Sequence, residues 1–180
     1  MEKGRKAFHV AFGLLVLMLL RTDVELAQAF LLVSLIGGLW VLSRKLGGRR
    51  VHLAERLIAA FGREEETPGR GAFWFVLGLL AISCFLPNPE EAFSAVLMLG
   101  IADGASALAG SGCRWRLPHN RQKSVCGSAA FALVSMISFF WVGRVAVPFA
   151  LLGAGIESMD NGFDDNLTLS LFAIVFFVIF

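Results

Sequence analysis

The sequence predicts an all-α fold: a polytopic membrane helix bundle that forms a single domain over residues 1–180. Hydrophobic residues make up 57% of the chain, and the mean hydropathy is +0.72; both values are typical of integral membrane proteins. Charged residues gather between apolar stretches instead of interrupting them. The net charge of +2 is too small to suggest a nucleic-acid partner.

Seven apolar stretches predict about seven transmembrane helices. Proline, glycine or charge separates neighbouring stretches, and these residues end apolar helices. Several stretches are shorter than the ~20 residues of a straight crossing, so we expect helices that extend into flanking polar residues or that are tilted. The first stretch has no small-residue cleavage site after it, which favours a transmembrane helix over a signal peptide. The stretches are 7–20, 24–42, 71–86, 92–109, 128–142, 145–156 and 167–180.

The positions of the basic residues predict the orientation of the bundle. Of the 16 Lys and Arg, three precede Phe8, seven lie in 44–70 and four lie in 114–123. Cytoplasmic loops carry an excess of Lys and Arg. We therefore expect the N-terminus and the loops at 43–70, 110–127 and 157–166 to face the cytoplasm, with one active site at that face.

An amphipathic segment and the three cysteines have structural interpretations. Residues 49–61, RRVHLAERLIAAF, place apolar side chains near one helix face, which is typical either of an interfacial amphipathic helix or of a loop helix packed on the bundle. The three cysteines, Cys84, Cys113 and Cys126, form no CxxC motif and are odd in number. They indicate neither a disulfide framework nor a zinc site.

An acid in the fourth stretch is the first candidate for chemistry. Asp103 lies in an apolar run, where a charge costs roughly 3 kcal/mol at a helix centre. Helical spacing puts Gly100, Ala107 and Gly110 on its face. Packing through Gly100 and Gly104 explains the glycines as a small-residue contact between helices, but it does not explain the acid. Asp103 could hold Mg²⁺ on a nucleotide, relay protons or pair with a basic residue.

A basic loop follows that acid. Lys123-Ser124 lies just before the next apolar helix, which we expect Gly127-Ser128 to open. A helix N-terminus offers free N–H groups and a positive dipole end, so this stretch could cradle a phosphate. The spacing is not that of a Walker A loop, and charges that only set topology are the alternative. The basic residues are Arg114, Arg116, Arg121 and Lys123.

The 157–166 loop is acidic and contains no Lys or Arg. Glu157, Asp160, Asp164 and Asp165 would stand opposite the basic loop. Because Mg²⁺ prefers one or two carboxylates together with phosphate oxygens, this arrangement suggests a metal shared with a phosphate. The alternative is a solvated turn in which Asp165 or Asn166 caps the last helix. At the other end of the chain, Lys6 and His9 share a helix side and could line the same site, or could simply flank the membrane.

These motifs run in one order along nearly the whole chain: RKAFH at 5–9, REEETPGRGAFWFVLG at 63–78, ADGASALAG at 102–110, KSVCGS at 123–128, and Glu157 followed by DDNLT at 164–168. In this combination the chain resembles the CTP-dependent lipid kinases, the group of dolichol kinase, phytol kinase and yeast-type diacylglycerol kinase. The resemblance implies transfer of the γ-phosphoryl group of a nucleoside triphosphate, typically CTP, to the hydroxyl of a membrane lipid alcohol.

The resemblance also implies roles for individual residues. Catalysis would fall to Asp103, Lys123 and Asp165, and Mg²⁺ would be held by Asp103, Glu157 and Asp165. The nucleotide would contact Gly110, Lys123, Ser124, Gly127, Ser128 and Asn166. Charge and position, and not the resemblance, lead us to expect Arg121 at the nucleotide and Lys6 and His9 on the substrate or phosphate side. The chain differs from the family pattern at Cys126, where the family often has an acid, and at Ala102 and Ser170.

Two further functions are compatible with the same residues. A cytidylyltransferase acting on a lipid phosphate would use the same nucleotide and metal but would attack the α-phosphorus. A small ion-coupled transporter would use Asp103 as a coupling or proton-relay site. A non-catalytic membrane scaffold would need none of these groups.

Overall fold

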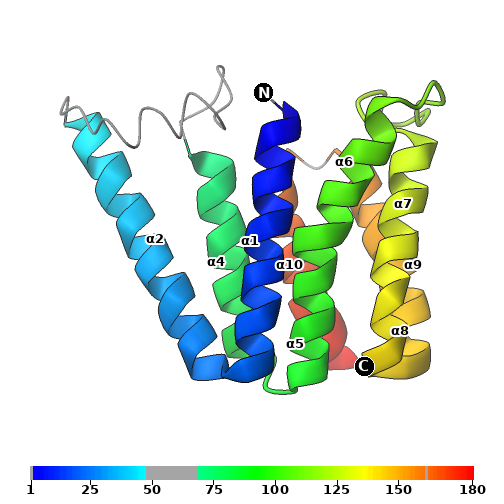
Figure 1. The fold of residues 1–180 in the computed structure, drawn as a ribbon. Helices are drawn as coiled ribbons and strands as arrows, with labels where there is room; N and C mark the ends of the chain where they lie inside the picture. The colour runs from blue at the N-terminus through cyan, green and yellow to red at the C-terminus, as the bar shows by residue number, and fades with distance from the viewer. Residues whose placement is uncertain (1, 48–68, 161) are drawn as a thin grey trace.

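The structure is a computed structural model that describes residues 2–47, 69–160 and 162–180. All elements within these residues are helical, apart from one isolated β-bridge between Arg116 and Ser124. The helices stand side by side (Figure 1), and each of the seven predicted apolar stretches lies in helix to within one residue. The all-α prediction is confirmed. The amphipathic segment predicted at 49–61 lies outside the described residues.

Helices α1 (Glu2–Thr22) and α2 (Val24–Leu46) form the first antiparallel pair. Asp23 separates them, and its Oδ1 accepts hydrogen bonds from the backbone N–H groups of Glu25 and Leu26. An acidic side chain in this position satisfies donors that a helix start leaves unpaired. Helix α4 (Arg70–Phe85) begins after Gly69, whose φ of 86° favours glycine, and it packs against α2.

The central rod of the bundle consists of three consecutive segments. They are α5 (Pro89–Val96), a π-helical turn η1 (Leu97–Ala102) and α6 (Asp103–Ser111). Asn88 accepts a hydrogen bond from Glu90 N at 3.1 Å, and Pro89 occupies the first turn, so the sequence defines the start of the rod. The π-turn is almost wholly buried and ends at Asp103. Since π-turns shift the helical register, η1 sets the direction in which Asp103 points.

The second half of the chain folds back on this rod. Helices α7 (Val125–Ser135) and α9 (Ala146–Ser158) pack against each other. They are joined by the short segments η2 (Met136–Ser138), α8 (Phe139–Val142) and η3 (Gly143–Val145). Gly143, at the junction of α8 and η3, has a φ of 59°, in the left-handed region that favours glycine. Helix α10 (Asp165–Ile179) then packs between α4 and α9.

Close approach between α1 and the central rod depends on glycine. A Cβ on Gly13 would lie 3.0 Å from the Cα of Gly100, and the same holds in reverse. A Cβ on Gly104 would collide with the Val10 side chain. The packing interpretation of Gly100 and Gly104 is therefore confirmed, and their partner is α1. Gly110 instead faces the start of α7, where an added Cβ would lie 2.9 Å from Ser124 Oγ. The predicted stripe of small residues therefore packs against two different helices, α1 and α7.

The surface and the helix lengths fit a membrane environment. Within the part of the chain that the structure describes, three helical runs are long and apolar enough to cross a membrane: Val24–Arg44, Pro89–Ser111 and Val125–Ser158. Large apolar side chains such as Leu133 and Phe140 are exposed, at 73% and 84% of their surface. In water such a surface would be costly, whereas lipid would cover it without penalty. A count of seven crossings remains a prediction.

The ends of the helices separate into two groups. The N-terminus, the 112–124 loop and the connection before α10 lie at one end of the bundle, and the C-terminus lies at the other (Figure 1). Of the loops expected to share one face, those at 110–127 and 157–166 therefore lie at the same end as the N-terminus, while most of the loop at 43–70 falls outside the described residues. That this end faces the cytoplasm remains a prediction.

Candidate functional site

Two lysines and three carboxylates occupy the N-terminal end of the bundle. The first group joins α1 to α6, where Lys6 Nζ lies 2.6 Å from Asp103 Oδ2. The side chain of Asp103 is 3% exposed and that of Lys6 is 12% exposed. The two residues are 97 positions apart in the chain. Asp103, whose place in an apolar stretch needed an explanation, therefore has a largely buried cation as its partner. Pairing with a basic residue was one of the roles predicted for this acid.

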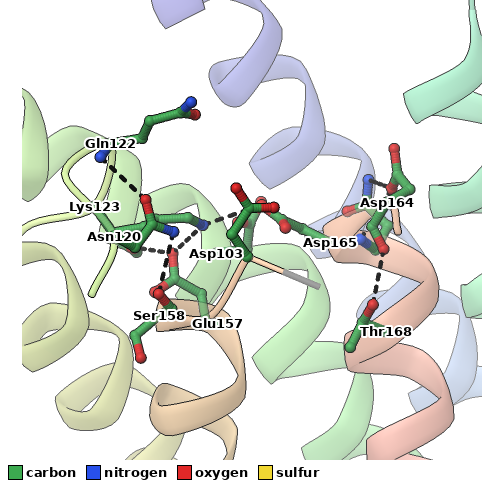
Figure 2. A network of polar contacts seen from close by, with 12 residues as sticks. Asp103, Asn120, Gln122, Lys123, Glu157, Ser158, Asp164, Asp165 and Thr168 are labelled. Carbon is green, nitrogen blue, oxygen red and sulfur yellow. Dashed lines mark hydrogen bonds and ion pairs between the residues drawn. The ribbon is translucent and has the colours of Figure 1, made fainter. Parts of the chain in front are cut away.

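The second group centres on Lys123. Its Nζ lies 2.7 Å from Glu157 Oε1 at the end of α9 and 3.0 Å from Asp165 Oδ2 at the start of α10. Figure 2 shows this side chain extending from its loop towards Glu157 and Asp165, with Asp103 beside them. The positive charge of Lys123 also acts on the Asp103 carboxylate. The two groups thus form one electrostatic site that joins α1, α6, α9, α10 and the basic loop.

The surroundings keep Lys123 protonated. Burial by itself would lower its pKa, but the charges of Glu157 and Asp165 and their hydrogen bonds outweigh burial and raise the pKa above the ordinary value. Lys123 is thus a fixed cation and not a proton acceptor at neutral pH. It can stabilise negative charge, which is the property that phosphoryl transfer needs.

Ser106 anchors the most buried member of this group. Its Oγ donates a hydrogen bond to Glu157 Oε1 at 2.9 Å, and both residues are buried. Ser106 was not among the predicted site residues. Its position three residues after Asp103, on the same helix side, was an available signal.

The basic loop is docked onto the end of α9. Asn120 Nδ2 donates to the backbone oxygen of Ser158 at 3.2 Å, and His119 Nε2 lies 3.2 Å from Ser158 Oγ. The backbone N–H of Leu117 bonds the Lys123 oxygen at 3.1 Å, which closes a short hairpin. Neither Asn120 nor Ser158 carries a sequence signal, because their pairing depends on how α9 lies against the loop.

The cysteine prediction is corrected by the structure. Cys113 and Cys126 form a disulfide, while Cys84 is free and exposed. An odd count and the lack of CxxC argued against pairing. The pairing arises because α6 and α7 pack closely beside the loop, which brings the two cysteines together.

The start of α7 is also corrected. The helix begins at Val125, and Ser124 is its N-cap, whose Oγ accepts from Gly127 N at 3.2 Å. A Cβ on Gly127 would lie 3.0 Å from the backbone oxygen of Ser106. Gly127 therefore permits close packing of α6 and α7. The backbone N–H of Gly127, which was expected to bind phosphate, is thus already bonded to Ser124. The Oγ of the next residue, Ser128, is buried without a hydrogen-bond partner among the described residues.

At α10 the cap is Asp164, and not Asp165 or Asn166 as predicted. Its Oδ1 accepts from Asn166 N at 3.0 Å and from Asn166 Nδ2 at 3.0 Å. Burial raises the pKa of Asp164, partly offset by the bonds from Asn166. Asn166 also donates to the Gly71 oxygen at 3.2 Å, which ties the start of α10 to α4. This frees Asp165 to reach Lys123.

Of the remaining predicted residues, His9 lies at the site and Arg121 lies on the surface. His9 is buried, stacks on Phe75 with ring centroids 4.2 Å apart, and interacts electrostatically with Asp103. Arg121 is exposed on the loop. The structure therefore brings Lys6 and His9 to the site and leaves Arg121 on the exposed surface of the loop.

The carboxylates do not by themselves form a complete metal site within the described residues. Among residues 2–47, 69–160 and 162–180, no three His, Cys, Asp or Glu side chains gather as a protein-only metal site. Glu157 Oε2 is nevertheless buried without a hydrogen bond from the described residues. One free carboxylate oxygen fits the way in which Mg²⁺ is held by one or two carboxylates plus phosphate oxygens.

Comparison with known proteins yields little functional information. No protein-family model matches the chain, and no solved structure matches it. The chain is similar to uncharacterized protein MJ1137 of Methanocaldococcus jannaschii, with 26% identity over 183 residues that cover 99% of this chain and 92% of the relative.

Proposed function

We propose that this protein is a membrane-embedded phosphotransferase that moves the γ-phosphoryl group of a nucleoside triphosphate, typically CTP, to the hydroxyl of a lipid alcohol. The observation that carries the proposal is the convergence of Lys6, Asp103, Lys123, Glu157 and Asp165 at one end of an apolar bundle. These residues come from the motifs on which the resemblance to the CTP-dependent lipid kinases rests.

The residues present suit the demands of this reaction. Phosphoryl transfer depends mainly on positioning and on cations that offset charge on the phosphate oxygens. Lys123 is held protonated beside two carboxylates, and Lys6 forms an ion pair with Asp103. Both lysines can exchange a carboxylate for a phosphate oxygen, because both interactions are of the same charge-assisted kind.

A bound Mg²⁺ would add a third cation to the two lysines, and the free Glu157 oxygen together with Asp103 and Asp165 could hold it. The acceptor hydroxyl would approach from the lipid side of the bundle, since apolar side chains face outward there. Asp103 and Asp165 are the candidates for accepting its proton; the pKa of Asp164 is raised, but its Oδ1 is engaged in capping α10.

The decisive experiment uses purified protein, Mg²⁺ and CTP or ATP labelled at the γ-phosphate, with polyprenol, phytol and diacylglycerol as acceptors. Label in the lipid phase is the expected result. A cytidylyltransferase would transfer label from the α-position and none from the γ-position. Ion-coupled flux in liposomes without nucleotide would favour the transporter, and an absence of label with every acceptor and donor would refute the kinase proposal.

A further inference from the structure

A covalent link surrounds the residue on which the site is centred. Cys113 follows the end of α6 by two residues, and Cys126 is the second residue of α7. Their disulfide therefore closes residues 113–126 into a ring, and Lys123 lies inside it. Its charge partners, Glu157 and Asp165, lie outside the ring on α9 and α10.

The ion pairs of Lys123 need such a restraint. A lysine has a long, flexible side chain, and a partly exposed pair gains little because both side chains must be held in one geometry. Asp165 is 47% exposed and Lys123 is 23% exposed. A cross-link lowers the conformational freedom of the loop before the pairs form, so less freedom is lost when they do.

The other contacts of the loop are weaker restraints. The loop is held to α9 by the Asn120 and His119 hydrogen bonds to Ser158, at 3.2 Å each. A neutral hydrogen bond contributes little net stability. Among the described residues, the disulfide is the one covalent restraint on this loop.

We propose that the Cys113–Cys126 disulfide positions Lys123 between Glu157 and Asp165, and that its reduction releases Lys123 from them. Both cysteines are partly accessible. If the loop faces the cytoplasm, as the basic residues predict, cellular dithiols reach it, because that compartment reduces disulfides. One dithiol attacks the bond, supplies two electrons and two protons, and leaves two thiols here and one disulfide in the reductant.

The positioning can be measured without any enzymatic assay. A double-mutant cycle of Lys123→Met and Glu157→Gln reports the coupling between these two side chains and subtracts the effect of each change alone. We expect a clear coupling in protein with the disulfide intact and its loss in a Cys113→Ser/Cys126→Ser background. Cys84→Ser is the matched control, and it should leave the coupling unchanged. Equal coupling with and without the bond would overturn the proposal.

Thiol labelling and kinetics complete the test. Alkylation should modify Cys84 alone before reduction and all three cysteines afterwards; labelling of Cys113 and Cys126 without reductant would also overturn the proposal. The kinetic arm rests on the proposed function: reduction should raise the KM for nucleotide several-fold more than it lowers kcat, and reoxidation should reverse this. Absence of activity in every form would count against the kinase alone, because the cycle tests the positioning separately.

Discussion

The buried pair of Lys6 and Asp103 provides the sharpest quantitative test of the site. Lys6→Met leaves the Asp103 carboxylate, 3% exposed, without its nearest cation. Breaking a buried pair from one side costs about 3–5 kcal/mol. Lys123 and His9 still act on Asp103, so we expect the lower end of that range, about 3 kcal/mol. The double variant Lys6→Met/Asp103→Leu removes both charges and should lie within about 1 kcal/mol of the wild type.

Reversible unfolding in mixed micelles, followed by far-UV circular dichroism, measures these differences. Glu25→Gln is the control, because Glu25 is an exposed acid at the opposite end of the bundle, and it should change stability by less than about 0.5 kcal/mol. Recovery of stability in the double variant without recovery of phosphotransfer would separate folding from function. If Lys6→Met costs no more than the double variant, the reasoning about a buried pair is refuted.

Three other predictions address single features, each measured by the same unfolding assay. Gly127→Ala should cost about 1–3 kcal/mol because the new methyl group meets Ser106 oxygen at 3.0 Å, whereas Gly112→Ala, in open space, should be nearly neutral; equal costs would contradict this packing. Asp164→Ala should cost about 1 kcal/mol by removing the cap of α10, and a neutral result would show that the cap is not needed. In the folded protein the pKa of Lys123 is raised. The ion pairs of Lys123 should therefore contribute fully to the free energy of unfolding below the ordinary lysine pKa of about 10.4. This contribution should be lost as the pH rises through the raised pKa of the folded state. The stability difference between wild type and Lys123→Met should therefore be larger at pH 8 than at strongly alkaline pH, and a difference that grows with pH would have the wrong sign.

Local signals predicted the helices well. Apolar length, Pro89 and the charged turns are properties of neighbouring residues, and helix formation depends on such neighbours. The start of α10 was predicted to within one or two residues, yet the cap is Asp164 rather than Asp165 or Asn166. Several polar residues in succession each could cap a helix, and only the backbone geometry selects one.

The sequence by itself determined that this chain is an all-α, apolar bundle and which polar residues are costly enough to require partners, because burial of charge is penalised whatever the fold. It also indicated that the basic and acidic loops share one end. Only the tertiary structure decided the partners: Lys6 for Asp103, and Lys123 for Glu157 and Asp165. It also decided that Cys113 and Cys126 pair, against the sequence prediction. The reason is that the ion pairs join residues far apart in the chain, and that the two cysteines meet only because α6 and α7 pack together; no local pattern records such helix packing.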